Sequence, residues 1–192
     1  MEPGRDAKFL PAGREGEVVV RGACAISCYE RRRLMGAEDP NDEAFSEGWL
    51  RTGDAGWFDD KGYLSLTGRF KEVINRGGEK LSPFAVEEVV QRHPEIQDVM
   101  AFAAPHTLLG EVVGLSLVGR AGAHVELEAL RDHCVRRGLS LKLLPEVAVW
   151  LRELPKGPTG KPARIGFAEK MQLAPLQAGQ QLEVDRRAGY HG

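Results

Sequence analysis

Three short runs of this chain carry residue types that could take part in phosphate or carboxylate chemistry: residues 48–54, 68–83 and 154–161. The middle run combines basic side chains, the adjacent glycines Gly77 and Gly78, and a helix start, an order that packing alone would not require. Cationic side chains beside glycine can approach an anion closely, because glycine leaves the backbone unobstructed. The runs therefore favour a site for negatively charged ligands.

Lys161 follows Gly160 near the end of the third run. A long, mobile ammonium group is suited to stabilising negative charge that develops during a reaction. A lone lysine at this kind of position is more often an exposed loop residue, because exposed lysines are the norm. The two companion runs shift the interpretation of Lys161 toward function.

Asp54 follows Thr52-Gly53 at the edge of an expected strand, and Arg69 opens the middle run. A carboxylate at this position could accept both hydroxyl hydrogens of a ribose, and a guanidinium suits planar phosphate contacts. Alternatively, Asp54 caps a turn and Arg69 makes a surface ion pair, which adds little stability. The residues alone leave both interpretations open.

The first part of the chain predicts a small antiparallel β segment with little core. The turn residues at 59–62 join its last two strands, since Asp and Gly favour a turn there. The expected elements are strands at 16–22, 49–51, 56–58 and 63–67 and a helical turn at 42–45.

The remainder predicts an α+β unit with helices packed on a three-stranded sheet. Gly77-Gly78 suits a hairpin, Ser82 is placed to cap a helix and Pro83 to begin it. Residues 173–192 show no periodicity and are expected to be disordered. The expected helices are 83–92, 126–137 and 164–171, and the expected strands are 99–103, 112–118 and 147–151.

The bulk composition limits the possible partners. The chain has 26 basic and 28 acidic residues and a net charge of -2, which gives no electrostatic case for nucleic acid. No run approaches the roughly 20 apolar residues of a membrane span, so we expect a cytoplasmic protein. The histidines show no ligand spacing and the three cysteines complete no tetrahedral site, so no metal site is expected.

Taken together, the three runs resemble the carboxy-terminal third of the adenylate-forming (AMP-binding) superfamily, which includes acyl-CoA synthetases, luciferase and peptide-synthetase adenylation domains. The resemblance covers residues 14–172. It implies that residues 1–68 complete a large AMP-binding domain and that residues 69–172 form a compact, mobile lid domain.

The resemblance assigns a role to each candidate residue. Lys161 becomes the catalytic lysine that bridges the substrate carboxylate and the nucleotide, and Asp54 and Arg69 hold the ribose and phosphate. Lys71 becomes the hinge about which the lid swings between an adenylating and a thioester-forming pose. In the second pose a glycine loop would admit the pantetheine arm of coenzyme A, with Arg76 or Lys80 meeting a phosphate; its residues are Arg76, Gly77, Gly78, Glu79 and Lys80.

The resemblance implies an ATP-dependent carboxylate:CoA ligase with ATP (AMP) and coenzyme A as cofactors. Mg²⁺ is expected for the full enzyme, although no residue of this chain is identified as its ligand. The nucleotide and the carboxylate would bind through a large domain, since no Ser/Thr/Gly-rich phosphate loop occurs here, and the fragment alone is expected to be inactive. Pro162 and Pro158 depart from the family pattern and restrict the backbone beside Lys161.

Two alternatives stay open. The chain could belong to an adenylation domain that loads a carrier protein, although Lys71 and the run at 76–83 look more like CoA synthetases. It could also be a non-catalytic lid or binding fragment, which the missing phosphate loop motivates.

Overall fold

The computed structural model describes residues 8–30, 39–158 and 160–188. The chain divides into two compact units, Met1–Lys71 (unit 1) and Glu72–Gly192 (unit 2). The short 3₁₀ helix η1 (Phe70–Glu72) contains the division between them. The mixed α+β fold expected from the sequence is confirmed.

The described residues of unit 1 form a four-stranded antiparallel sheet with one short helix. Strand β3 (Trp49–Phe58) pairs with β1 (Gly16–Val20), with β2 (Phe45–Ser46) and with β4 (Leu64–Arg69), and α1 (Pro40–Ala44) precedes β2. The two strands expected at 49–51 and 56–58 are therefore one continuous strand, which is a correction to the prediction.

The predicted turn between β3 and β4 is confirmed. Asp59 Oδ1 accepts hydrogen bonds from the amides of Lys61 at 2.9 Å and Tyr63 at 2.8 Å. Gly62 adopts a φ of 83°, a region that glycine enters without steric cost.

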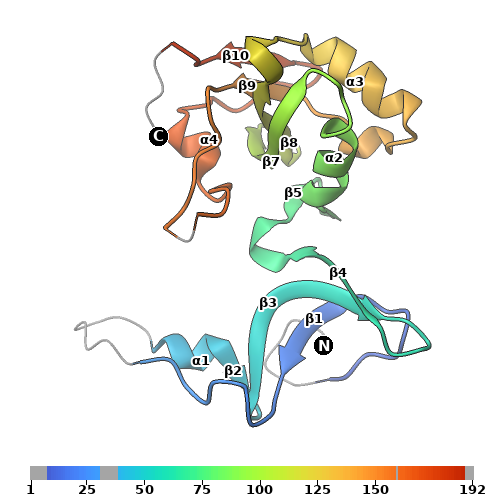
Figure 1. Ribbon diagram of the computed structural model, residues 1–192, viewed down its shortest axis with the longest axis vertical. Helices are drawn as coiled ribbons and strands as arrows, with labels where there is room; N and C mark the ends of the chain where they lie inside the picture. The colour runs from blue at the N-terminus through green and yellow to red at the C-terminus, as the bar shows by residue number, and fades with distance from the viewer. Residues whose placement is uncertain (1–7, 31–38, 159, 189–192) are drawn as a thin grey trace. The chain divides into compact units, whose positions relative to one another are not determined.

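Unit 2 contains a mixed six-stranded sheet (Figure 1). The three predicted strands are β7 (Ile96–His106), β8 (Gly110–Gly119) and β9 (Val147–Trp150). The hairpin of β5 (Ile74–Arg76) and β6 (Glu79–Leu81) joins β8 on one side, and β10 (Leu182–Asp185) lies parallel to β9. The sheet is thus larger than the predicted three strands, and β10 lies within the tail that was expected to be disordered.

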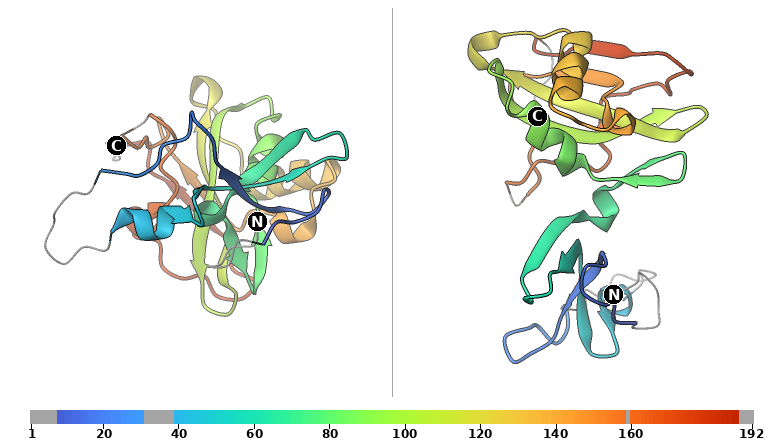
Figure 2. Two further views of the ribbon diagram at one scale, coloured as in Figure 1. Left: turned by 90° about the horizontal axis from the view of Figure 1, so that it is seen from below. Right: turned by 90° about the vertical axis from the view of Figure 1, so that its right-hand side faces the viewer.

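Helices cover both faces of this sheet. In the right-hand view of Figure 2, α2 (Pro83–Val90) and α3 (Leu127–Arg136) lie in front of the strands, whereas Figure 1 places α4 (Phe167–Lys170) on the opposite side. Two further 3₁₀ turns, η2 (Arg120–Gly122) and η3 (Leu141–Leu143), connect strands and helices. In the described ranges, no helix combines the length and apolar character needed to cross a membrane.

Alternate residues of the strands fill two separate cores, because successive side chains of a strand point to opposite faces. Trp150 packs in the core beneath α2 and α3, and Phe102 packs with Phe167 in the core beneath α4. All three side chains are essentially buried. The sheet therefore provides a rigid base for the loops at its edges.

Candidate functional site

Asp54 and Arg69 face each other across strands β3 and β4, at paired positions of the register. Arg69 Nε donates a hydrogen bond to Asp54 Oδ1 at 2.7 Å, and the two side chains remain 50% and 27% exposed, respectively. A carboxylate has two acceptor oxygens and a guanidinium five N–H groups, so the pair retains hydrogen-bonding capacity beyond this contact. The structure thus brings together two residues that the sequence assigned to one ligand.

The run before Asp54 is fixed to strand β1. Thr52 Oγ1 donates to the carbonyl of Val18 at 2.7 Å and accepts from the amide of Asp54 at 3.1 Å. Gly53 adopts a φ of 72°, and its amide donates to Glu17 Oε1 at 3.2 Å. These bonds set the direction in which the Asp54 carboxylate leaves the strand.

Lys71 is the middle residue of η1 and the last residue of unit 1. Its Nζ lies 3.9 Å from Glu43 Oε2, and the two side chains are 82% and 76% exposed. An exposed ion pair of this kind contributes little. It therefore restrains the backbone at Lys71 only weakly.

The glycine loop is the turn of the β5–β6 hairpin. Gly77 and Gly78 have φ values of 58° and 90°, and a two-residue turn of this hand requires positive φ at both positions. The amide of Gly77 donates to the carbonyl of Leu109 at 2.8 Å, which holds the loop beside the β7–β8 turn. Lys80 stands opposite Asn75 in the same hairpin.

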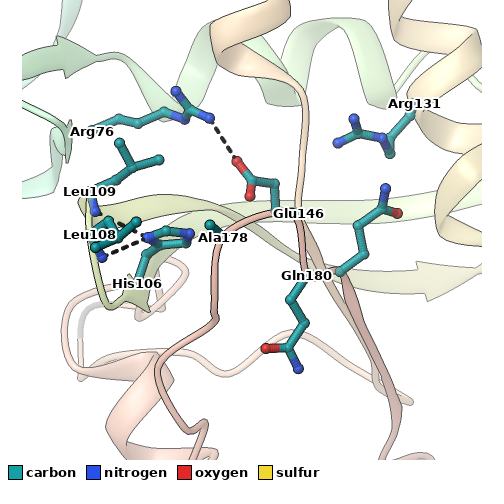
Figure 3. A pocket seen from close by; sticks show the side chains of 10 residues that line it. Arg76, His106, Leu108, Leu109, Arg131, Glu146, Ala178 and Gln180 are labelled. Atoms are coloured by element: carbon teal, nitrogen blue, oxygen red, sulfur yellow. Dashed lines mark hydrogen bonds and ion pairs between the residues drawn. The ribbon is translucent and has the colours of Figure 1, made fainter.

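Arg76 points from this hairpin into a pocket of about 340 Å³ (Figure 3). Its Nη2 lies 3.0 Å from Glu146 Oε1, and both side chains are largely buried. His106 Nδ1 accepts hydrogen bonds from the amides of Leu108 and Leu109 at 3.1 and 3.0 Å. The pocket is lined by Arg76, His106, Leu108, Leu109, Arg131, Glu146, Ala178, Gly179, Gln180 and Gln181.

Two guanidinium groups, those of Arg76 and Arg131, line the pocket. Arg131 Nη1 donates to the carbonyl of Pro145 at 2.6 Å, so this second guanidinium is held in place. Its Nε also lies 3.5 Å from Glu128 Oε2, so Arg131 is paired with Glu128 as Arg76 is with Glu146. Guanidinium groups suit phosphate or carboxylate, and an anionic ligand would compete with these two carboxylates for them. Sequence reasoning named Arg76 but missed Arg131 and Glu146, because they meet Arg76 only once the strands have paired.

Lys161 lies on a different loop of unit 2, which closes on itself through its backbone. The amide of Gly157 donates to the carbonyl of Lys161 at 2.8 Å, and the amide of Ala163 donates to the carbonyl of Pro155 at 2.8 Å. Pro162 forms a β-bridge with Lys156, so the proline is compatible with this closure. The Lys161 side chain is exposed, and Thr159 lies outside the described residues.

The chain is similar to enzymes named as CoA ligases. The AMP-binding enzyme C-terminal domain family matches residues 85–161. Sulfoacetate–CoA ligase of Cupriavidus necator is 38% identical over 163 residues, which cover 84% of this chain and 31% of that enzyme. Oxalate–CoA ligase of Saccharomyces cerevisiae is 40% identical over 164 residues, which cover 83% of this chain and 29% of that enzyme.

Solved structures agree with these relatives. The amide bond synthetase McbA from Marinactinospora thermotolerans superposes with a TM-score of 0.73 and 33% identity, over 87% of this chain and 33% of McbA. The o-succinylbenzoate CoA synthetase from Bacillus subtilis, in complex with an acyl-adenylate, superposes with a TM-score of 0.74 and 29% identity, over 85% of this chain and 32% of that chain. The chain belongs to the adenylate-forming, AMP-binding superfamily.

Within this superfamily the chain corresponds to the carboxy-terminal portion, and unit 2 has the fold of the lid domain. The chain spans less than a third of the length of the curated relatives, from 27% to 31%. The adenylate-forming family match ends at residue 161, so the pocket residues Ala178–Gln181 lie beyond it.

Among the described residues, His124, Glu126 and Glu183 form a group that could hold a metal ion and that the sequence did not indicate. His124 Nε2 lies 2.5 Å from Glu183 Oε1 and 3.8 Å from Glu126 Oε1. Arg187 Nη2 lies 3.4 Å from His124 Nδ1, where a metal-bound histidine would instead donate to an acceptor. The arrangement therefore fits an ion-paired network that ties β10 to the start of α3, rather than a metal centre.

Proposed function

We propose that this chain is the carboxy-terminal part of an ATP-dependent carboxylate:CoA ligase that works through an acyl-adenylate. The observation that carries the proposal is the exposed Lys161 on a self-closed loop, in a chain 38–40% identical to two CoA ligases. Unit 1 then completes the large AMP-binding domain, and unit 2 acts as the lid. The nucleotide and the carboxylate bind through the large domain, the fragment alone does not turn over, and a cytoplasmic location stays a prediction.

In the first half-reaction a carboxylate oxygen of the substrate attacks the α-phosphorus of ATP. The new oxygen–phosphorus bond forms as the bond to pyrophosphate breaks. Negative charge gathers on the oxygens around the phosphorus, and the Lys161 ammonium stabilises it. Asp54 accepts hydrogen bonds from the ribose hydroxyls, and Arg69 contacts the sugar and phosphate.

In the second half-reaction the coenzyme A thiolate attacks the acyl carbonyl, and AMP leaves with the electrons of the acyl–oxygen bond. A backbone rotation at Lys71 moves the lid between the two poses. Gly77 and Gly78 then leave room for the pantetheine arm, and Arg76 or Lys80 binds a phosphate of coenzyme A. The two guanidinium groups that line the pocket, those of Arg76 and Arg131, support the latter role.

Replacing Lys161 tests the proposal. In a full-length enzyme that carries this chain, Lys161→Ala should lower acyl-adenylate formation by about 100- to 1,000-fold, because it removes the charge that stabilises the transition state. ATP–pyrophosphate exchange measures this step. Thioester formation from supplied acyl-adenylate should change little.

Lys156→Ala is the matched control, since Lys156 is an exposed lysine of the same loop. It should leave both half-reactions close to their original rates. Equal loss of both half-reactions in Lys161→Ala would contradict the role assigned to Lys161.

A second candidate differs in the acceptor. The similarity to an enzyme named an amide bond synthetase indicates that this fold does not by itself fix what receives the acyl group. A carrier protein in place of free coenzyme A is the alternative. The hairpin at Arg76–Lys80 would then meet a tethered pantetheine arm instead of a free one.

A further inference from the structure

Arg164 lies three residues after Lys161, at the base of the loop that holds this lysine. Its side chain is only 8% exposed, and its Nε lies 2.8 Å from Glu72 Oε2. Its Nη1 donates to Glu87 Oε1 at 2.6 Å and to the carbonyl of Ala101 at 3.0 Å. One guanidinium therefore joins the end of η1, helix α2 and strand β7.

The site requires a guanidinium rather than any positive charge. Arg164 also lies over the ring of Phe84, with 4.6 Å between the guanidinium carbon and the ring centroid. A planar guanidinium has several N–H donors and a flat face, so it can contact two carboxylates, a carbonyl and an aromatic ring at once, whereas an ammonium acts as a point charge. Glu72 and Glu87 are each 17% exposed, so without Arg164 two largely buried carboxylates would lose their cationic partner.

These contacts connect the two places where the lid function is expected. Glu72 directly follows Lys71, the proposed hinge. The backbone hydrogen bonds of Gly157 and Ala163 close the loop from residue 155 to residue 163. Because Arg164 directly follows this loop, fixing Arg164 also fixes the position of the Lys161 backbone. Glu87 is itself fixed, since its Oε1 accepts from the amide of Ala101 at 2.7 Å.

We propose that Arg164 is a positioning residue that clamps the Lys161 loop to the segment directly after Lys71. A backbone rotation at Lys71 then moves Glu72 and the loop of residues 155–163 together as one rigid body. Lys161 therefore moves with the lid, and the loop does not deform during the motion. The catalytic consequence rests on the proposed function, whereas the clamp is a property of unit 2 alone.

Hydrogen exchange of the 192-residue chain tests the clamp without any activity. Arg164→Met should accelerate exchange of the amides of Gly157, Gly160 and Ala163 by about tenfold, the change expected for loss of one charge-assisted hydrogen bond. Amides of β8 and β9, which make no bond to Arg164 or Glu87 among the hydrogen bonds described above, should keep their rates. Arg164→Lys should give loop exchange rates between those of the wild type and of Arg164→Met. Arg92→Met removes an exposed arginine paired with Glu88 on α2 and should leave the exchange rates of the loop unchanged.

Two outcomes of this experiment would overturn the clamp. Unchanged exchange in the loop would show that Arg164 does not hold it. Equal acceleration throughout unit 2 would show that Arg164 supports the fold as a whole rather than the loop.

Glu72→Ala tests the coupling in a full-length enzyme, because it removes the carboxylate that lies 2.8 Å from Arg164 Nε and leaves the Arg164–Glu87 pair in place. Adenylate formation should fall by about tenfold, since small misplacement of a catalytic group slows a reaction strongly. Thioester formation from supplied acyl-adenylate should change less than twofold. Equal loss in both half-reactions, or no loss, would overturn the positioning role. If Lys161→Ala leaves adenylation intact, the proposed function is wrong. Hydrogen exchange alone then shows whether Arg164 holds the loop.

Discussion

The two units of this chain are stabilised in different ways. Unit 2 buries large apolar side chains on both faces of its sheet, with Trp150 and Phe102 essentially inaccessible. Among the described residues of unit 1, by contrast, Ala55 is the buried hydrophobic residue, while Tyr63 is 72% and Leu66 63% exposed. Apolar burial is the main favourable term in folding, so unit 2 has a core of its own and unit 1 has almost none.

Unit 1 is organised around a buried charge instead. The Glu17 side chain is 4% exposed, and its Oε2 accepts from Arg51 Nε at 2.9 Å and Nη2 at 2.7 Å. Its Oε1 accepts from the amide of Gly53. A sheet held by polar contacts and carrying exposed apolar residues supports the proposal that unit 1 completes a larger domain.

Paired tryptophan substitutions should show the contrast most strongly. Trp150→Ala removes a fully buried side chain and should cost about 3–5 kcal/mol of unfolding free energy. Trp57→Ala, at a site 36% exposed in unit 1, should cost less than about 1 kcal/mol. Urea unfolding followed by circular dichroism measures both, and similar losses would contradict the proposed difference between the units.

Removing the charge of Glu17 in unit 1 should give the next largest loss of stability. Glu17→Gln keeps the shape of the side chain but removes the charge that pairs with Arg51, which should cost about 1–3 kcal/mol within unit 1. Hydrogen exchange at the amide of Gly53 should accelerate, and exchange in β8 should not. Glu15→Gln, at an exposed neighbouring position, is the control and should leave both rates unchanged.

The sequence predicts the core of unit 2 because burial there follows a simple pattern. The apolar runs at 99–103, 112–118 and 147–151 belong to β7, β8 and β9, and the helices expected at 83–92 and 126–137 are α2 and α3. Local composition was sufficient in each case, since the strands carry nearly continuous apolar runs and the helices carry apolar residues at helical spacing.

Other elements depend on partners that local composition does not reveal. β10 has no periodicity of its own and becomes a strand by pairing with β9. The sequence predicts separate strands at 49–51 and 56–58, whereas β3 runs through both and Gly53 takes its positive φ within the strand. The pocket around Arg76 needs Glu146, which lies 70 residues away in the sequence.

The smallest predicted effect concerns the buried carboxylate of unit 2. Burial raises the pKa of Glu87 above its ordinary value of 4.5, against the opposing influence of Arg164 and of the Ala101 amide. The native state therefore holds this proton to a higher pH than the unfolded chain does. The contribution of Glu87 to stability is complete below pH 4.5 and is lost as the pH rises through the native pKa.

Glu87→Gln should remove this dependence, because an amide does not titrate while its oxygen can still accept from Arg164 and Ala101. The unfolding free energy of the variant should decline less than that of the wild type as the pH rises above 4.5. Glu88→Gln, at an exposed position of the same helix, should retain the wild-type slope. Identical slopes for all three proteins would mean that pairing with Arg164 cancels the effect of burial on the pKa of Glu87. A steeper decline in Glu87→Gln than in the wild type would mean that pairing outweighs burial and lowers this pKa.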